Sequence, residues 1–320
     1  MRVAFVGKGG SGKTTLSALF SRHLVRSGAP VVAIDGDINQ HLAYALGLDE
    51  DELFTAPPLS ARTGEIKDYL RGTNPRIPSR DAMVKTTPPG RGSRLLRLLG
   101  DDEVHSPHVQ EVAGVPLMVT GAFGESDLGV ACYHSKLGVV ELYLNHLIDG
   151  SGEYVVVDMT AGADAFASGL FTRFDMTFLV VEPTRKSVSV YRQYRDHAAE
   201  FGIPVAVVGN KVTGPDDLAF LRGHVGEDLI AHCEQSSYVR AQEQGRGGHG
   251  ELEPHNTLAL DRLRAAVDSR TKDWAAFQRH AVDFHLRNAT AWANEATGQD
   301  LASQVDPGFR HGPKALAAFA

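Results

Sequence analysis

The sequence predicts an α/β protein with a doubly wound, mostly parallel sheet that carries helices on both faces. One observation is a series of apolar runs that end in polar or glycine-rich turns, at residues 3–6, 30–37, 115–120, 154–158, 176–181 and 204–212. A second is helical periodicity between and after these runs, at residues 16–24, 137–148, 187–201 and 256–267. The third is a glycine-rich stretch between the first apolar run and the first helix. Such sheets bind their ligands at the carboxyl ends of the strands.

The composition limits the class of protein. Hydrophobic residues make up 42% of the 320 residues and charged residues 22%, which is typical of a globular protein. No apolar run approaches the roughly 20 residues of a membrane-spanning helix. Because the first apolar run reads as a strand, we expect no cleavable signal. Two cysteines are too few for a disulfide scaffold, so we expect a cytoplasmic protein. The net charge of −7 disfavours general nucleic-acid binding, and we expect neither nucleic acid nor a membrane as a partner.

The stretch GKGGSGKTT at residues 7–15 has the pattern of a phosphate-binding loop. Glycines allow backbone conformations in which successive N–H groups turn towards phosphate oxygens at the positive end of the following helix. Lys13 is expected to reach the β- and γ-phosphates, and the Thr14 hydroxyl to bind Mg²⁺. The predicted nucleotide-binding residues of this loop are Gly9, Gly10, Ser11, Gly12, Lys13, Thr14 and Thr15.

A second lysine, Lys8, is not part of an ordinary phosphate-binding loop. With it, the loop resembles the deviant Walker A loop of one ATPase class. That class includes the nitrogenase iron protein, the Min- and Par-type positioning ATPases, the arsenite and tail-anchored-protein ATPases, and the nickel-insertion ATPases of carbon monoxide dehydrogenase maturation. In this class the extra lysine reaches the nucleotide of the partner subunit. The resemblance therefore implies an ATP-hydrolysing homodimer in which Lys8 and Lys13 are catalytic.

Two carboxylates, Asp35 and Asp37, end the second predicted strand. Asp35 either belongs to the ligand site or caps the helix expected at residues 40–46. Asp37 is similar to the second aspartate of the class's Asp-x-Asp-Pro switch I element, which orients the attacking water. The resemblance thus makes Asp37 a catalytic residue, although Ile38 stands where the class has proline.

Asp158 ends the apolar run at residues 154–158, as the acid of a Walker B strand does. Such an acid lies beside the phosphate-binding loop and binds Mg²⁺ through water. The following Thr-Ala-Gly turn resembles switch II, in which the backbone N–H of the glycine, here Gly162, senses the γ-phosphate. Asp164 is expected to be a helix cap or a switch contact. Asn210 is similar to the adenine-recognising asparagine of the class, because an amide both donates to and accepts from a base edge.

Cys132 and His134 precede the helix expected at residues 137–148. The nickel-insertion ATPases have a Cys-x-Cys pair at this place, and each subunit contributes its pair to one interfacial metal. In this chain His134 replaces the second cysteine. A two-fold axis would still assemble two thiolates and two imidazoles, which suit Zn²⁺ or Ni²⁺. The alternative is a small buried cysteine and a histidine at a helix start. A [4Fe–4S] cluster is not expected, because no cysteine closely follows Asp158.

Residues 51–112 form a long, proline-rich insertion with short helical pieces expected at 65–70 and 93–99. Between residues 61 and 98 there are nine lysines and arginines and three acidic residues, so the insertion is cationic. It is either a solvated surface lobe or a docking site for an acidic protein partner. Nucleic acid is a third alternative, which the near absence of aromatic residues disfavours.

The expected domains are a P-loop ATPase domain at residues 1–270 and a helical extension at 271–320 that is partly disordered. In the helix at 256–267, Leu258, Leu260, Leu263 and Ala266 are expected to face inward. In the extension, a helical stripe most often packs on its own domain, and few basic residues flank this one, which disfavours membrane binding. The stripe consists of Trp274, Phe277, Ala281, Phe284, Asn288 and Trp292. Residues after Gly298 have no clear period and are expected to be loosely ordered.

The resemblance leaves two functions open. The first is an accessory or maturation ATPase that couples its nucleotide state to the handling of a metal or a partner protein. The second is a Par- or Min-like positioning ATPase that binds a partner, membrane or DNA in its ATP-bound dimer. The cysteine before the helix favours the first function. A basic C-terminal surface would favour the second, and the sequence shows none.

Overall fold

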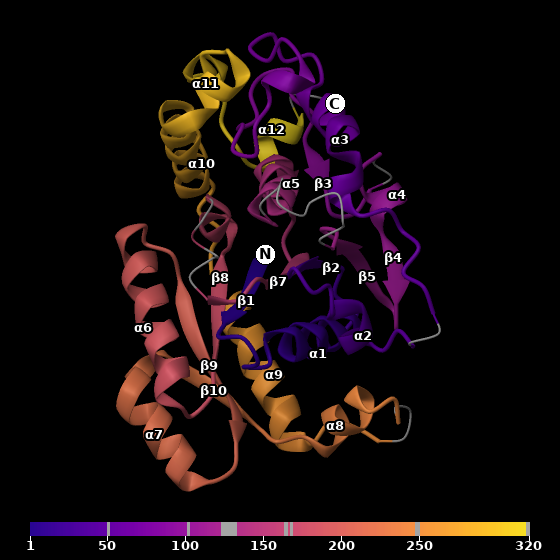
Figure 1. Ribbon diagram of the computed structural model, residues 1–320, viewed down its shortest axis with the longest axis vertical. Helices are drawn as coiled ribbons and strands as arrows, with labels where there is room; N and C mark the ends of the chain where they lie inside the picture. Colours follow the sequence, from indigo (N-terminus) through magenta and orange to yellow (C-terminus); the bar gives the residue numbers. More distant parts are fainter. Residues whose placement is uncertain are drawn as a thin grey trace.

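The computed structural model describes residues 1–49, 52–100, 103–122, 133–162, 166, 169–246 and 250–317, with the backbone alone at 133–135 and 317. In this part of the chain, an eight-stranded sheet has the order β10-β9-β8-β1-β7-β2-β5-β4 (Figure 1). Its strands are β1 (Arg2–Gly7), β2 (Val31–Gly36), β4 (Gln110–Val112), β5 (Val115–Val119), β7 (Tyr154–Met159), β8 (Met176–Val181), β9 (Val205–Val212) and β10 (Leu229–Glu234). Neighbouring strands are parallel except β4 and β5, so the predicted mostly parallel α/β fold is confirmed.

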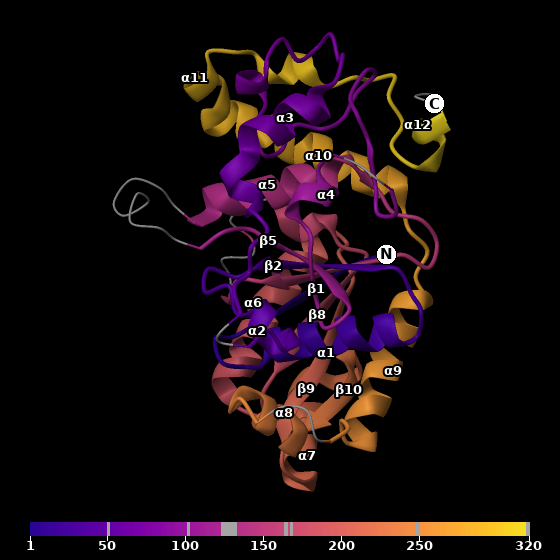
Figure 2. The same cartoon turned by 90° about the vertical axis from the view of Figure 1, so that its right-hand side faces the viewer.

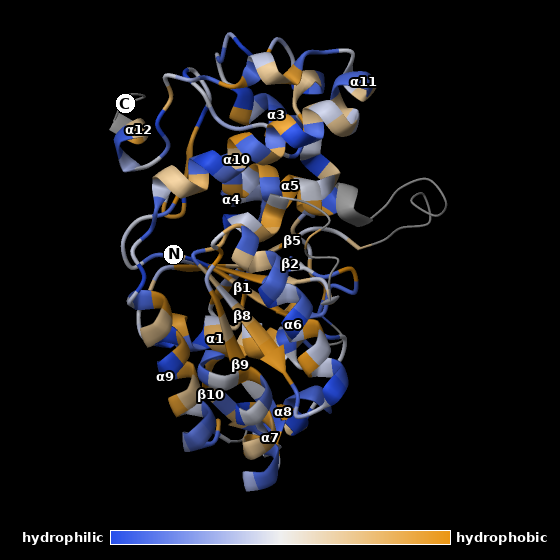
Figure 3. Ribbon diagram, turned by 90° about the vertical axis from the view of Figure 1, so that its left-hand side faces the viewer, coloured by the Kyte–Doolittle hydropathy of each residue, from blue (hydrophilic) through white to orange (hydrophobic). Residues whose placement is uncertain are grey.

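Helices cover both faces of this sheet (Figures 1 and 2). One face packs against α1 (Lys13–Arg26), α2 (Leu42–Leu46) and α9 (Pro254–Asp268), and the other against α5 (Tyr133–His146), α6 (Arg185–Glu200) and α7 (Pro215–Val225). Successive strand residues point to opposite faces, so Phe5 packs in the first layer and Val6 in the second. Because both faces are buried, the central strands are largely apolar between their ends (Figure 3).

The insertion and the C-terminal extension lie together at one end of the molecule, at the top of Figure 1. The insertion contributes η1 (Leu59–Arg62), α3 (Thr63–Arg71), η2 (Arg80–Ala82), β3 (Leu96–Arg97) and α4 (His105–His108). The extension contributes α10 (Trp274–Asn288), the π-helix η7 (Ala289–Ala293), α11 (Asn294–Thr297), η8 (Leu301–Gln304) and α12 (Pro313–Ala317). Gln304 donates a hydrogen bond of 2.7 Å to the carbonyl of Ala82, and Arg91 Nε lies 3.1 Å from Asp306 Oδ2. The two segments therefore form one lobe.

The start of the extension is held by two buried arginines. Arg2 pairs with Asp149 at 2.9 Å, Lys272 pairs with the same carboxylate, and the Arg2 guanidinium lies 4.3 Å from the centre of the Phe277 ring. Arg173 lies 4.5 Å from the same ring and donates to the Phe277 carbonyl. With Phe277 and Ala281 buried, the aromatic stripe packs on its own domain, as predicted.

Three expectations about local structure are wrong. Residues 93–99 are not helical, because β3 pairs in parallel with β6 (Leu147–Ile148) and this pairing buries Leu96. Leu258 faces solvent with 47% of its surface exposed, since the buried side of α9 is formed by Ala259, Leu260, Leu263 and Val267.

Residues 299–317, which were expected to be loosely ordered, also pack more closely than expected. Leu301, Phe309 and His311 are buried. This segment has no helical periodicity, and hydrogen bonds between the Gln304 side chain and the insertion hold it. The boundary near residue 270 stays a prediction.

The remaining elements are η5 (Gly169–Arg173), η6 (Gly226–Asp228) and α8 (Ser237–Glu243). Cys233 lies inside β10 as a buried free thiol. Among the helices described here, none is both long enough and apolar enough to cross a membrane.

Candidate nucleotide-binding site

The glycine-rich loop connects β1, which ends at Gly7, to α1, which begins at Lys13. Gly10 and Gly12 have φ angles of 79° and 95°, a region that favours glycine. A Cβ atom on Gly12 would also overlap the amide nitrogen of Asn210. The loop thus needs glycine for both its conformation and its packing, and it ends at a helix N-terminus, where backbone N–H groups favour an anion.

The end of β9 holds this loop from the side. Asn210 donates a hydrogen bond of 2.7 Å from Nδ2 to the carbonyl of Ser11, and Lys211 donates one of 2.6 Å to the carbonyl of Gly10. Asn210 is buried. The residue predicted to read adenine therefore lies at the loop, where its amide also fixes the loop backbone.

Asp158, at the end of β7, lies beside the first turn of α1. Its two carboxylate oxygens accept hydrogen bonds from Thr14 Oγ1 at 2.6 Å and from Ser17 Oγ at 3.2 Å. β7 is hydrogen-bonded between β1 and β2, which is why the two predicted magnesium residues, Thr14 and Asp158, come into contact. Burial raises the pKa of Asp158 to about 6, against the opposing effects of the Thr14 hydrogen bond and the Lys13 charge.

Asp35, at the end of β2, is fully buried and accepts hydrogen bonds from the backbone N–H groups of Asp37, at 3.1 Å, and Leu42, at 2.8 Å. Leu42 begins α2, so the contact agrees with the helix-capping alternative for Asp35. Burial, and then the nearby charge of Asp158, raise the pKa of Asp35 well above its ordinary value. Asp35 is thus part of the support of the site.

Asp37 approaches the lysine of the phosphate-binding loop. Its Oδ2 lies 3.9 Å from Lys13 Nζ, and its Oδ1 accepts hydrogen bonds from the backbone and the side chain of Asn39. Lys13 is buried, with 6% of its surface exposed. Lys13 and Asp37, both predicted to be catalytic, therefore lie close together although they are 24 positions apart in the sequence.

Lys8 lies at the outer edge of the site. Its Nζ is 3.5 Å from Glu182 Oε2, while Lys211 Nζ is 2.9 Å from Glu182 Oε1. Glu182 follows β8, the neighbour of β1. In this single chain, both lysines therefore share one carboxylate.

Not every predicted residue can be placed as closely. Gly162 follows β7 with a φ of 72°. Gly9 lies in the loop and Thr15 in the first turn of α1, as expected. Cys132 and Asp164 lie outside the described residues. For His134 the backbone alone is described, in the first turn of α5. The interfacial metal site therefore stays a prediction.

Sequence reasoning missed three residues that contact the site: Ser17, Glu182 and Lys211. Ser17 lies one helical turn after Lys13, where α1 meets β7. Glu182 and Lys211 occur at the carboxyl ends of β8 and β9. Their positions beyond apolar strands of a parallel sheet are the signal that could have identified them.

The residues present fit a magnesium nucleotide. Mg²⁺ prefers oxygen ligands, and the site offers the hydroxyl of Thr14 beside the carboxylate of Asp158. The buried Ser11 hydroxyl has no hydrogen-bond partner among the described residues, so a phosphate oxygen would satisfy it. The charge of Lys13 and the helix N-terminus complement the negative charge of phosphates.

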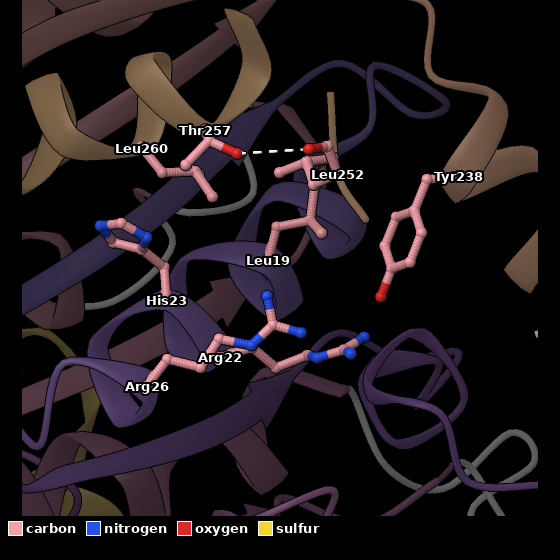
Figure 4. A pocket seen from close by; sticks show the side chains of 8 residues that line it. All are labelled: Leu19, Arg22, His23, Arg26, Tyr238, Leu252, Thr257 and Leu260. Carbon is pink, nitrogen blue, oxygen red and sulfur yellow. Dashed lines mark hydrogen bonds between the residues drawn. The ribbon is translucent and has the colours of Figure 1, made fainter. Parts of the chain in front are cut away.

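A separate hollow lies between α1 and α9 and is lined by Arg22, Arg26, Tyr238 and Thr257 among others (Figure 4). Its volume of about 30 Å³ has room for one or two water molecules but not for a nucleotide. His23, at its edge, pairs with Asp261 at 3.0 Å. The phosphate-binding loop and the contact of Thr14 with Asp158 instead assign the nucleotide to the carboxyl ends of β1, β2 and β7.

Known proteins resemble this chain in both sequence and fold. The carbon monoxide dehydrogenase accessory protein CooC of Rhodospirillum rubrum is 27% identical over 272 residues, which cover 84% of this chain and 97% of CooC. An uncharacterized ATP-binding protein of Methanocaldococcus jannaschii is 29% identical over 231 residues, 72% of this chain and 81% of that protein.

Two solved structures share the fold. The cell division ATPase MinD of Pyrococcus furiosus has a TM-score of 0.53 at 14% identity and covers 83% of this chain and 98% of its own. The MinC:MinD complex of Aquifex aeolicus has a TM-score of 0.52 at 18% identity, with 85% and 97% covered. Residues 3–227 match the CobQ/CobB/MinD/ParA nucleotide binding domain family, and because this match spans more than half of the sequence, the chain belongs to that family.

Proposed function

We propose that this chain binds and hydrolyses ATP with Mg²⁺ and works as a homodimeric molecular switch. The observation that carries the proposal is the convergence of Lys13, Asp37, Thr14 and Asp158 at the ends of three neighbouring strands. Lys13, and Lys8 from the partner subunit, would neutralise charge on the phosphates. Asp37 would orient the attacking water, and Thr14 and Asp158 would hold the metal ion, which supplies charge stabilisation when it is bound.

Steady-state hydrolysis and nucleotide binding test this proposal. We expect Lys13→Ala to lower ATP turnover by at least about 100-fold, because removal of a charge that stabilises the transition state costs about this much. Asp37→Asn should retain nucleotide binding and lose turnover. Lys186→Ala, which removes an exposed lysine of α6, is the matched control. Wild-type turnover in Lys13→Ala would refute the proposal.

Lys8 carries the proposal of a homodimer with a shared active site. Lys8 Nζ is partly exposed and is held by the half-buried Glu182, so little energy is needed to release it towards a partner. We expect Lys8→Ala to bind ATP but to lose ATP-dependent dimerisation and turnover. An unchanged rate in Lys8→Ala would show that the cross-subunit role is wrong.

We further propose an accessory or maturation role, in which the nucleotide state is coupled to handling of a metal such as Zn²⁺ or Ni²⁺, or of a partner protein. The similarity to the accessory protein CooC over nearly its full length supports this role. Metal content and dimerisation should be compared between wild type, Cys132→Ser and His134→Ala, with and without ATP. Absence of stoichiometric metal, together with unchanged dimers in both variants, would exclude the interfacial metal. The alternative is a Par- or Min-like positioning ATPase, which the shared fold supports equally.

We also propose a binding partner and a cellular location for this chain. An acidic protein partner would bind the cationic residues of the insertion at 61–98. Arg80 and Arg91 pair there with Asp68 and Asp306 of the same chain, so Arg97, which is exposed, is the better candidate for a contact. A cytoplasmic location would suit a chain with two cysteines, one of them a buried free thiol. Loss of partner capture in Arg97→Glu, but not in Lys186→Ala, would support the docking site.

A further inference from the structure

Three metal-ligating side chains meet at the edge of the sheet formed by β10. His232 and Glu234 belong to β10, and His255 belongs to the first turn of α9. Each offers one ligand atom, and these three atoms all lie within 4.8 Å of one another. β10 is three strands away from β1, roughly 14 Å across the sheet, so this cluster is separate from the phosphate-binding loop.

The distances are close to those of a coordinated ion. Ligand atoms at about 2.1 Å from a tetrahedral metal lie roughly 3.4 Å from one another. Side-chain rotations that move the ligand atoms by about 1 Å would therefore complete the site. The centres of the two imidazole rings are 4.5 Å apart, with an angle of 51° between the ring planes. The rings are therefore tilted relative to each other and not stacked flat.

The backbone that carries the three residues is fixed. Asn256 Oδ1 accepts a hydrogen bond of 2.9 Å from the N–H of Glu234, and Asn256 Nδ2 donates one of 3.0 Å to Glu253. Asn256 is buried and follows His255 directly. It therefore ties the start of α9 to the end of β10 and sets the position of His255 relative to Glu234.

One nitrogen of the cluster has no hydrogen bond to any residue that the structure describes. Nε2 of His255 is buried and lacks a partner among the described residues, and a buried polar atom of this kind needs an external partner. An unpartnered imidazole nitrogen of this kind suits a metal ion.

We propose that His232, Glu234 and His255 form a binding site for a divalent transition-metal ion. Two imidazoles and one carboxylate are a ligand set used for Zn²⁺, which is the ion this site fits best. Three protein ligands leave a fourth position for water or for a ligand from another molecule. The site is independent of both nucleotide binding and the interfacial Cys132 and His134.

The test uses the full chain with Cys132→Ser and His134→Ala, so that the interfacial pair cannot contribute metal ligands. Metal-free protein is titrated with Co²⁺, followed by its visible absorption, and then with Zn²⁺ in competition. We expect one Co²⁺ per chain, and at least a tenfold loss of Zn²⁺ affinity in His232→Gln, Glu234→Gln and His255→Gln. His224→Gln, which removes an exposed histidine of α7, should bind as the parent does.

Two results would overturn the proposal. One is the absence of stoichiometric Co²⁺ and Zn²⁺ in the parent. The other is equal affinity in the three ligand variants and in His224→Gln. Because Glu234 is exposed, Glu234→Gln is expected to fold, and unchanged ATP binding in each variant verifies this. A failure here would leave the ATPase proposal untouched, since that proposal is tested through Lys13.

Discussion

The ammonium group of Lys8 lies 3.5 Å from the carboxylate of Glu182, which is also bound more closely, at 2.9 Å, by Lys211. The stronger partner of Glu182 is therefore Lys211, and Lys8 is the more easily released. The side chain of Lys8 is 35% exposed, so its pairing with Glu182 contributes about 1 kcal/mol at most. Glu182 can thus hold Lys8 in the single chain without preventing its transfer to the partner subunit of the proposed homodimer.

Glu182→Gln should increase ATP-dependent dimerisation. In the proposed dimer it removes the charge that competes with the partner's nucleotide for Lys8. Each of the two subunits loses one interaction of about 1 kcal/mol at most, which together corresponds to a dimer up to about 30-fold tighter. The dimer dissociation constant, from sedimentation with ATP, is the measurement. Glu200→Gln, which changes an exposed glutamate of α6, should have no effect. If Glu182→Gln has the same effect in a Lys8→Ala background, the effect does not pass through Lys8.

Asn210→Ala should weaken nucleotide binding by about tenfold. The change leaves the carbonyl of Ser11 without its hydrogen bond, and an unsatisfied buried acceptor costs about 1–3 kcal/mol. Binding is measured with ATP and with a triphosphate that carries a different base. A support role for the loop predicts equal losses for the two ligands.

A selective loss for ATP would instead indicate that Asn210 acts by reading the base. Asn288→Ala, which removes an amide from α10, is the control and should bind both nucleotides as wild type does.

The sheet and the loop could be predicted because their signals are local. β7 carries three consecutive valines that are buried on both faces, and Gly12 has a left-handed backbone conformation that favours glycine. The contact of Thr14 with Asp158 also followed from sequence, since Walker residues at the ends of neighbouring parallel strands must meet.

The lobe formed by the insertion and the extension could not be predicted in this way. Gln304 and Ala82 are 222 residues apart, and Arg91 and Asp306 are 215 apart, with no periodicity to connect them. The pairing of Lys8 with Glu182 likewise joins two loops from different strands, and residue types alone do not specify which lysine an isolated glutamate contacts.

The stability of the fold should decrease in mild acid. Burial lowers the pKa of His146 and of His285 from 6.5 to about 4. Both bind protons more weakly in the folded state than in the unfolded chain. The free energy of unfolding is therefore highest above pH 6.5 and falls as the pH decreases towards 4, by up to about 3 kcal/mol for each residue. Denaturant titrations between these pH values measure this dependence.

His285→Gln isolates one of these contributions. His285 Nε2 donates to the carbonyl of Leu301 and Nδ1 accepts from the Thr86 hydroxyl, which suits the neutral ring. The variant should be less stable than wild type at pH 7. Its free energy of unfolding should also depend less steeply on pH, by the equivalent of about one bound proton. Asp158, whose raised pKa acts in the opposite direction, is common to both proteins and cancels. An unchanged slope in His285→Gln, equal to that of His224→Gln, would refute this assignment.

Truncation after Gly298 should destabilise the whole lobe. It removes the buried side chains of Leu301 and Phe309, each worth about 1.5–3 kcal/mol, together with the bonds of Gln304 and Asp306 to the insertion. Unfolding should require about 3–6 kcal/mol less free energy, and trypsin should cleave faster at Arg91, whose partner Asp306 is lost. Gln299→Ala in the full chain is the control, since Gln299 is exposed. Equal cleavage of the insertion in the truncated and full-length proteins would show that the extension does not stabilise the insertion. Faster cleavage at Arg91 alone would assign the change to the Arg91–Asp306 ion pair.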